Sequence, residues 1–141
     1  MSRKDAKLES LGRVPLFAGL GKRELQRVGQ LTDLMDLPAG RVLMRQSEWG
    51  SEMMVILEGR AQVEREGDVV GEIGAGGVAG EMALLAEGPR NATVTLLTDA
   101  SLLVVGHREF HALMDEMPSV RAQVFEGLAR RLIALESASP G

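Results

Sequence analysis

A short segment near the middle of the chain, residues 80–93, combines the residue types that bind an anion. It reads GEMALLAEGPRNAT. Gly80 permits a close backbone approach, and we expect a single helical turn from Glu81 to Leu85 whose unpaired amides face an incoming anion. Arg90 supplies the countercharge, because a guanidinium can hold two phosphate oxygens at once. A carboxylate accepts hydrogen bonds from hydroxyls, so Glu81 suits a sugar, and the segment predicts a ligand that carries both groups.

The spacing of these residues resembles the phosphate-binding cassette of the cyclic nucleotide-binding domain family. That family includes cyclic-AMP-dependent kinase regulatory subunits, cyclic-nucleotide-gated channels and bacterial catabolite-activator-type regulators. The chain can be aligned with it from about Val14 to about Leu132 without a large gap. The matching positions are Gly80-Glu81-x-Ala83-Leu84 and Pro89-Arg90-x-Ala92-Thr93, with Leu57-x-Gly59-x-x-Val63 upstream resembling a strand-turn-strand signature.

The resemblance implies a role for each residue of the cassette. Arg90 is expected to pair with the cyclic phosphate, Glu81 with the ribose 2′-hydroxyl, and the amides of Ala83 and Asn91 with the remaining polar atoms. The expected ligand-binding set is Gly80, Glu81, Met82, Ala83, Arg90, Asn91 and Ala92. In the family the last helix moves on ligand binding and caps the purine. The candidates by position are Phe125, Leu128 and Arg131, with a packing or solvent-facing role as the open alternative for each.

Two positions depart from the family's pattern. Ala79 stands where an aromatic residue usually precedes the Gly-Glu pair, which indicates a packing change. Asn91 follows the arginine, where the family often has Ala, Ser or Thr. A Thr at this position is associated with guanine preference, and an amide can make a similar hydrogen bond. Asn91 therefore leaves the base open, and the expected ligand is cyclic AMP, with cyclic GMP as the alternative.

Length, composition and charge restrict the other functions. The 141 residues suit one domain. The formal net charge is −4, and the 16 basic and 20 acidic residues are spread along the chain, so direct nucleic acid binding is not expected. The chain has no cysteine, which excludes a thiolate nucleophile. It has no apolar run of membrane-span length and no signal-peptide core near its start, so we expect a cytoplasmic protein without membrane contact.

Short apolar runs between turn residues predict a mainly β fold with flanking helices. We expect an eight-stranded antiparallel β-roll, jelly-roll-like, with N-terminal helices and two C-terminal helices. The run 53–57 predicts a strand buried on both sides. Residues 1–136 are expected to form one domain, and 137–141 a disordered tail. The strands are expected near 33–37, 41–45, 53–57, 61–66, 69–73, 92–97 and 102–105, and the helices near 3–12, 22–30, from 108 onward, and from 118 to about 136.

Two other motifs carry weaker signals. The glycine-rich run 73–77 lacks the Lys-Ser/Thr of a Walker loop, so it is better interpreted as a turn. His107 and His111 are four apart on an expected helix, but no glutamate at the metalloprotease position and no third ligand accompany them, so no metal is expected. A cupin-type metalloenzyme would need histidines inside the strands, and the expected strands contain none.

The expected function is a cyclic nucleotide sensor, with no catalysis and no cofactor, whose ligand shifts the C-terminal helices. The alternative is an interaction module that keeps the roll and no longer binds nucleotide. The last helix has more apolar surface than one contact with the roll needs, which indicates a homodimer or a protein partner there. The chain ends where a catabolite-activator-type regulator would begin its helix-turn-helix, so a stand-alone receptor and an excised domain both stay open.

Overall fold

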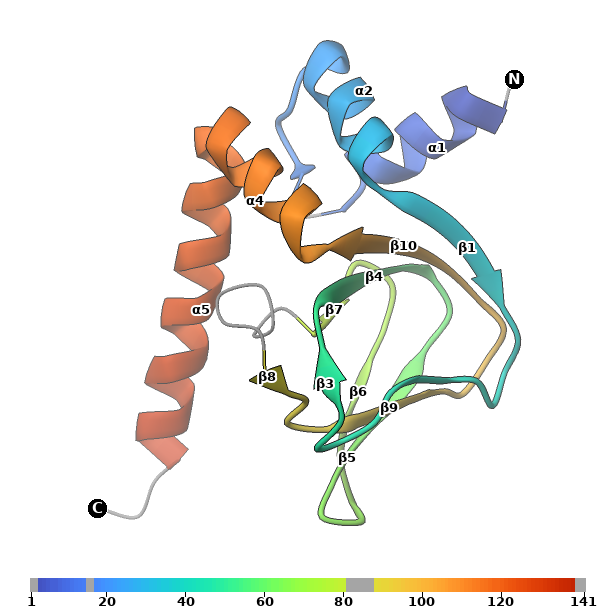
Figure 1. Ribbon diagram of the computed structural model, residues 1–141, viewed down its shortest axis with the longest axis vertical. Coiled ribbons are helices and arrows are strands. Elements are labelled where there is room, and N and C mark those ends of the chain that lie inside the picture. Colours follow the sequence, from blue (N-terminus) through green and yellow to red (C-terminus); the bar gives the residue numbers. More distant parts are fainter. Residues whose placement is uncertain (1–2, 15–16, 81–87, 139–141) are drawn as a thin grey trace.

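The computed structural model describes residues 3–14, 17–80 and 88–138. Two N-terminal helices, α1 (Arg3–Gly12) and α2 (Lys22–Leu31), lie near α4 (His107–Glu116) at one end of the strands (Figure 1). The last helix, α5 (Pro118–Ala138), extends from α4 along one side of the molecule. No helix in the described part of the chain is both long enough and apolar enough to cross a membrane.

The strands form two four-stranded antiparallel sheets and a two-stranded ladder. The first sheet has the order β1-β10-β4-β7, the second has the order β2-β9-β5-β6, and β3 pairs with β8. This arrangement confirms the predicted β-roll with flanking helices. The strands are β1 (Asp33–Leu37), β2 (Val42–Met44), β3 (Trp49–Gly50), β4 (Glu52–Glu58), β5 (Ala61–Arg65), β6 (Asp68–Ile73), β7 (Val78–Ala79), β8 (Gly88–Pro89), β9 (Thr93–Leu96) and β10 (Ala100–Gly106).

The described residues contain ten strands, where the sequence predicted eight. Every strand range predicted from the sequence contains a strand. The strands outside the seven ranges located in the sequence are β3, β7 and β8, each of two residues, and a run of that length is too short to show an alternating pattern. The observed strands are therefore roughly consistent with the predicted eight, and the short segments were not located because they pair only through the tertiary fold.

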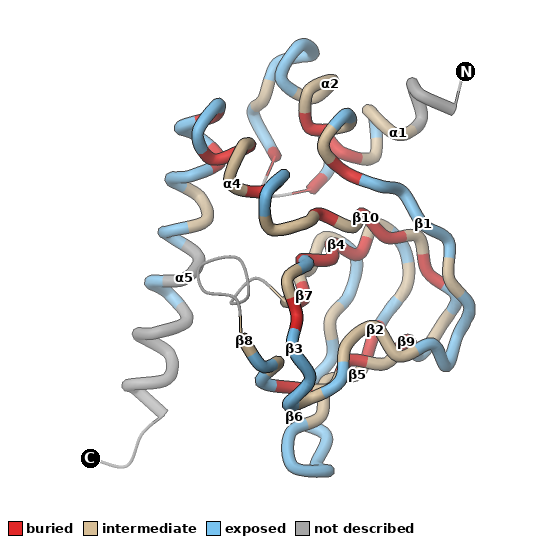
Figure 2. The backbone as a smooth tube through the Cα atoms, viewed as in Figure 1, coloured by how far each residue is buried: buried red, intermediate tan, exposed pale blue. Residues whose placement is uncertain are grey.

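The buried residues include two clusters, one that joins the helices to the first sheet and one among the strands of the roll. Figure 2 shows which stretches of the backbone are buried. Met53 and Val55 belong to the cluster that joins the helices to the first sheet, whereas Ile56 belongs to the cluster inside the roll. Successive residues of a strand face opposite sides, so a strand with packing on both faces has a continuous apolar sequence. The prediction that 53–57 is buried on both sides is confirmed for Met53 to Ile56, all of which are buried.

The predicted strand-turn-strand signature around Gly59 joins β4 to β5. Gly59 has a φ of +110°, and a Cβ atom there would lie 2.7 Å from the carbonyl oxygen of Asp99. Only glycine fits this combination of left-handed backbone and close contact. The glycine-rich run is also a turn, as predicted, because the amide of Gly77 donates to the carbonyl oxygen of Gly74 at 2.9 Å.

Two sets of polar contacts position the helices. The Lys7 ammonium on α1 donates to the carbonyl oxygens of Gly29 and Thr32 at the end of α2, each at 2.9 Å. Arg27 on α2 holds Glu116 on α4 through two hydrogen bonds of 2.8 and 2.7 Å. The Arg27 guanidinium keeps the pKa of the Glu116 carboxyl below its ordinary value. This ion pair orients α2 against α4. Because both side chains are exposed, the pair adds little stability.

The last helix continues slightly further than its apolar pattern indicated. It ends at Ala138, so Ser137 and Ala138, predicted to belong to a disordered tail, are helical. Residues 139–141 of that predicted tail lie outside the described residues. A helix end often extends past the last apolar residue of the pattern, because a further turn needs only its own backbone hydrogen bonds.

Candidate functional site

Arg90 follows β8, and its backbone is held by the loop that precedes β3. The amide of Arg90 donates to the carbonyl oxygen of Glu48, and the amide of Ser47 donates to the carbonyl oxygen of Arg90, both at 2.8 Å. Two residues before Arg90 in the chain, Gly88 of β8 pairs with Gly50 of β3. The two-residue ladder and the two hydrogen bonds together fix where the arginine side chain starts.

The side chain of Arg90 lies across the backbone of two glycines. A Cβ atom on Gly50 would lie 1.9 Å from Nε of Arg90 and 2.2 Å from its Cζ. A Cβ atom on Gly80 would lie 2.7 Å from Nη1 of Arg90, and Gly80 also has a left-handed φ of +83°. Real side chains are not found at such distances, so the guanidinium occupies space that exists only because both residues are glycine.

The environment of the Arg90 guanidinium is unusual for an arginine. Its Nη1 is buried and has no hydrogen-bond partner in the described parts of the chain. Burial lowers the pKa of Arg90 from its ordinary value, and the negative charge of Glu52 partly opposes this shift. A buried donor on a charged group is normally hydrogen-bonded, because leaving it unpaired is costly. The site therefore offers a partly desolvated cation with a donor that no described group uses, which suits an anionic oxygen.

The structure places some of the predicted cassette residues beside the arginine. Gly80 and Arg90 are brought together as described, while Asn91 is exposed and Ala92 is buried. Glu81, Met82 and Ala83, with the predicted helical turn from 81 to 85, lie outside the described residues. Ala79 is buried in the cluster inside the roll, so its side chain has a packing role.

Of the predicted purine-cap residues, only Phe125 has a described side chain. It lies on α5 and is 53% exposed. The side chains of Leu128 and Arg131 lie outside the described residues. The two histidines considered as metal ligands contact each other through their rings, with centroids 4.4 Å apart. No group of three metal-ligating side chains occurs among the residues that the structure describes.

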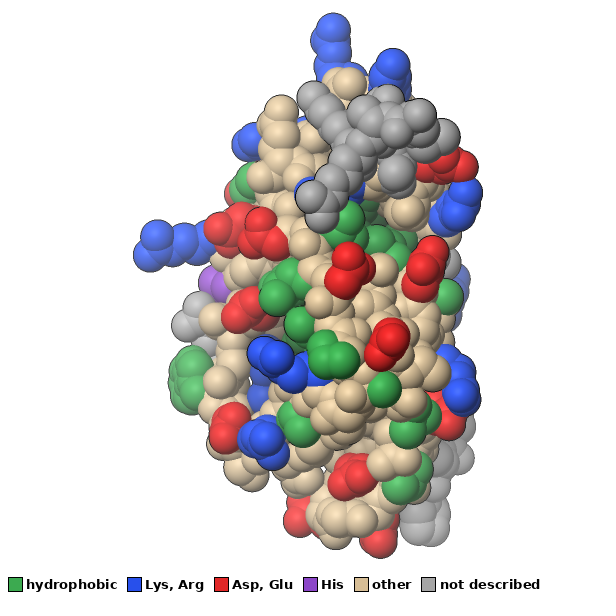
Figure 3. Space-filling model, turned by 90° about the vertical axis from the view of Figure 1, so that its right-hand side faces the viewer, with side chains coloured by type: hydrophobic (Ala, Val, Ile, Leu, Met, Phe, Trp, Pro, Cys, Tyr) green, Lys and Arg blue, Asp and Glu red, His purple; other side chains and the backbone are tan. Residues whose placement is uncertain are grey.

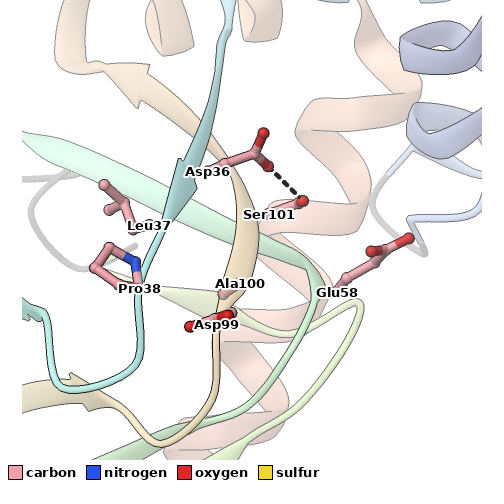
Figure 4. Close-up of a pocket in the computed structure, with 7 residues that line it drawn as sticks. All are labelled: Asp36, Leu37, Pro38, Glu58, Asp99, Ala100 and Ser101. Atoms are coloured by element: carbon pink, nitrogen blue, oxygen red, sulfur yellow. Dashed lines mark hydrogen bonds between the residues drawn. The ribbon is translucent and has the colours of Figure 1, made fainter.

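A pocket of about 410 Å³ lies elsewhere, at the ends of β1, β4 and β10 (Figure 4). Its lining residues include the acidic Asp36, Glu58 and Asp99. Asp36 accepts a hydrogen bond of 2.6 Å from Ser101, and Asp99 accepts one of 2.9 Å from the amide of Ala39. Such a lining repels a phosphate, so Arg90 is a better anion site than this pocket.

Figure 3 shows the face of the molecule that lies on the right-hand side in Figure 1. Acidic and hydrophobic side chains are interspersed over it, and the basic side chains are scattered singly. Scattered basic residues do not make the continuous positive surface that a nucleic acid backbone needs. This face therefore has the mixed charge that the sequence indicated.

Sequence reasoning missed the loop at 45–50 as part of the site. Its residues carry no recognisable anion-binding motif, and they lie about forty positions from Arg90 in the chain. Gly50 precedes a buried strand, as many turn glycines do, so only the fold shows which side chain lies on it. The contact of the Gln46 amide with the hydroxyl of Thr93, at 2.9 Å, was missed for the same reason.

Comparisons with known proteins identify relatives of this chain. A family model described as "Cyclic nucleotide-binding domain" matches residues 34–117. A cyclic nucleotide-gated potassium channel of Rhizobium etli is 39% identical over 107 residues, which cover 76% of this chain and 30% of the channel. The Cyclic AMP receptor protein of Thermus thermophilus is 28% identical over 123 residues, which cover 84% of this chain and 57% of that protein.

Solved structures show the same fold. The crystal structure of the Thermus thermophilus Catabolite Activator Protein matches with a TM-score of 0.80 and 28% identity, over 86% of this chain and 60% of that one. The N-terminal domain of a Streptomyces coelicolor A3(2) transcriptional regulator matches with a TM-score of 0.71 and 29% identity, over 92% of this chain and 94% of that one.

The chain spans less than two thirds of the length of the channel and of the receptor protein. The family match, in contrast, covers more than half of this chain and runs from β1 to the end of α4, with both Gly80 and Arg90 inside it. The matched segment thus contains the roll, the glycine pair and the arginine that lies across it. By fold and by sequence, the chain belongs to the cyclic nucleotide-binding domain family.

Proposed function

We propose that the protein binds a 3′,5′-cyclic nucleotide, cyclic AMP in the first instance, and acts as a sensor. The observation that carries this proposal is the buried Nη1 of Arg90, which has no hydrogen-bond partner in the described parts of the chain. An oxygen of a cyclic phosphate supplies both the missing acceptor and the countercharge. The relatives named as a cyclic nucleotide-gated channel and a cyclic AMP receptor protein support the same class of ligand.

In this proposal the residues around Arg90 complete the contact with the nucleotide. Glu81 binds the ribose 2′-hydroxyl, and the amides of Ala83 and Asn91 bind the remaining polar atoms. Gly80, Met82 and Ala92 form the wall of the site. Phe125, Leu128 and Arg131 on α5 cap the purine.

Ligand binding is proposed to act through the C-terminal helices. Helix α4 follows β10 directly, and α5 follows α4 after the single residue Met117. Because the connections are this short, a shift of α5 toward the purine is transmitted to α4. We propose no catalysis, no cofactor, no nucleic acid contact and a cytoplasmic location.

A titration with fluorescent cyclic AMP, repeated with cyclic GMP, tests the proposal. Trp49 is the one tryptophan of the sequence, and it lies in β3 beside Gly50 with 69% of its surface exposed. Its intrinsic fluorescence therefore gives a second, label-free readout next to the arginine. Saturable binding of either nucleotide supports the sensor, and the ratio of the two affinities shows how Asn91 affects the choice of base. Failure of both to bind favours the interaction module.

A Glu81→Ala substitution is expected to weaken binding of cyclic AMP by about 1.5 to 3 kcal/mol, the contribution of a hydrogen bond to a charged acceptor. The loss should disappear with 2′-deoxy cyclic AMP, because the hydroxyl that Glu81 serves is then absent. Parallel titrations of both proteins with both nucleotides measure the effect. If the two proteins discriminate ribose from deoxyribose equally, Glu81 does not contact the sugar.

We also predict that α5 mediates self-association that depends on the ligand. Val120 is buried and Val124 packs against the cluster between the helices and the sheet, whereas Phe125 beside them is exposed. A ligand that repositions Phe125 changes the surface available to a second copy. By linkage, any change in dimer affinity on ligand binding equals the change in ligand affinity on dimerisation. Sedimentation with and without cyclic AMP measures it, and a monomer under all conditions would leave only a different protein as the partner.

A further inference from the structure

Gly50 lies in β3 directly beneath the Arg90 side chain. The residue is buried, and the three heavy atoms nearest to a Cβ built on it all belong to Arg90, at 1.9, 2.2 and 2.7 Å. Its backbone φ lies outside the left-handed region, so the conformation itself is open to alanine. The arginine side chain is therefore the nearest obstacle to a side chain at this position.

Gly80 is different in this respect. Its φ is +83°, and a Cβ atom there would meet the carbonyl oxygen of Glu52 at 2.8 Å as well as the arginine. A substitution at Gly80 therefore strains the backbone whatever Arg90 does. Of the two glycines under the guanidinium, only Gly50 allows the placement of the arginine to be tested separately from backbone strain.

We propose that Gly50 is a positioning residue for the ligand site, because the missing side chain leaves the space in which the Arg90 guanidinium is held ready for the phosphate. The hydrogen bonds of Ser47 and Glu48 to the Arg90 backbone fix the start of the side chain, so a methyl group at position 50 displaces the guanidinium and leaves the main chain in place. The ligand named here rests on the proposed function, whereas the placement of Arg90 does not.

The first test follows the arginine itself and needs no nucleotide. Phenylglyoxal modifies accessible guanidinium groups, and mass spectrometry of peptides gives the rate at each arginine. In the unmodified protein Arg90 should react slowly, because its Nη1 is buried. In a Gly50→Ala protein the rate at Arg90 should rise toward that of the exposed Arg41, whose own rate serves as the internal reference. Unchanged protection of Arg90 would overturn the proposal.

The second test measures binding. Gly50→Ala should weaken cyclic AMP binding, and the loss should not exceed that of Arg90→Ala, about 30- to 4,000-fold, because the displaced guanidinium keeps its charge. Gly71→Ala is the matched control, since Gly71 also lies in a strand, has no left-handed φ and has nothing within 4 Å of a built Cβ. That protein should bind as the unmodified one does. Full affinity in the Gly50→Ala protein would contradict the inference.

A combined variant covers the case in which Gly50→Ala fails to fold. Arg90→Ala removes all three atoms that the new methyl group would meet, so Gly50→Ala with Arg90→Ala should fold with the melting temperature of Arg90→Ala alone. Rescue of folding by the second substitution supports the inference. If the double variant is also unfolded, Gly50 is needed for another contact and the proposal is wrong. If phenylglyoxal modifies Arg90 faster in Gly50→Ala but neither cyclic nucleotide binds the unmodified protein, the proposed ligand is wrong. The role of Gly50 in positioning Arg90 is then still supported.

Discussion

Replacement of Arg90 by alanine is expected to reduce the affinity for cyclic AMP by about 30- to 4,000-fold, and the protein should stay folded. Removing one partner of an enclosed, hydrogen-bonded charge pair costs about 2 to 5 kcal/mol, which corresponds to that range. Folding should survive because Nη1 has no partner in the described parts of the chain, so its removal leaves no described group unpaired. The substitution also removes a desolvated charge.

One further variant separates the contribution of the charge of Arg90 from that of its geometry, and a second is a control. Arg90→Lys keeps the positive charge and loses the two-pronged fork, so its affinity should lie between those of the unmodified protein and Arg90→Ala. Arg41→Ala removes an exposed arginine from the loop between β1 and β2, and it should bind normally. Fluorescence titration and thermal unfolding measure all three. Unchanged affinity for cyclic AMP in Arg90→Ala would contradict the proposal that Arg90 binds the cyclic phosphate.

The main features of the fold followed from local patterns in the sequence. A buried strand with packing on both faces has an uninterrupted apolar run, and Met53 to Ile56 show this in the sequence as clearly as in the structure. Helix α5 was predicted from residues that recur at helical spacing, and only its end differed. These features depend on residues close together in the chain, so the sequence is sufficient to predict them.

The parts of the site that the sequence did not predict depend on contacts between distant residues. Gly50 and Arg90 meet because β3 pairs with β8, and both strands are two residues long. Two residues are too few to show the alternation of apolar and polar side chains that marks a strand in the sequence. The pairing of β3 with β8 is instead stabilised by the rest of the roll. The motif around Gly80 and Arg90 therefore predicted an anion site, whereas the loop that holds the arginine could be found only in the folded chain.

The second large effect is expected at Phe110, which connects α4 to the first sheet. Phe110 is 0% exposed and belongs to the cluster that joins the helices to β4 and β10. Phe110→Ala should lower the free energy of unfolding by about 3 to 5 kcal/mol, because a large buried ring leaves a cavity that its neighbours fill only in part. A domain of this size is stable by about 5 to 15 kcal/mol in total, so much of that stability would be lost.

Phe125 provides the control for this prediction, because the same atoms are removed from a side chain that is 53% exposed on the adjacent helix. Phe125→Ala should change the free energy of unfolding by no more than about 0.5 kcal/mol, as is usual at exposed positions. If Phe125 caps the purine, however, this variant should bind cyclic AMP more weakly, whereas folded Phe110→Ala should bind with nearly normal affinity. Urea unfolding and nucleotide titration of both variants therefore separate packing from capping. Equal stability losses would contradict the assigned burial, and normal binding by Phe125→Ala would remove Phe125 from the proposed cap.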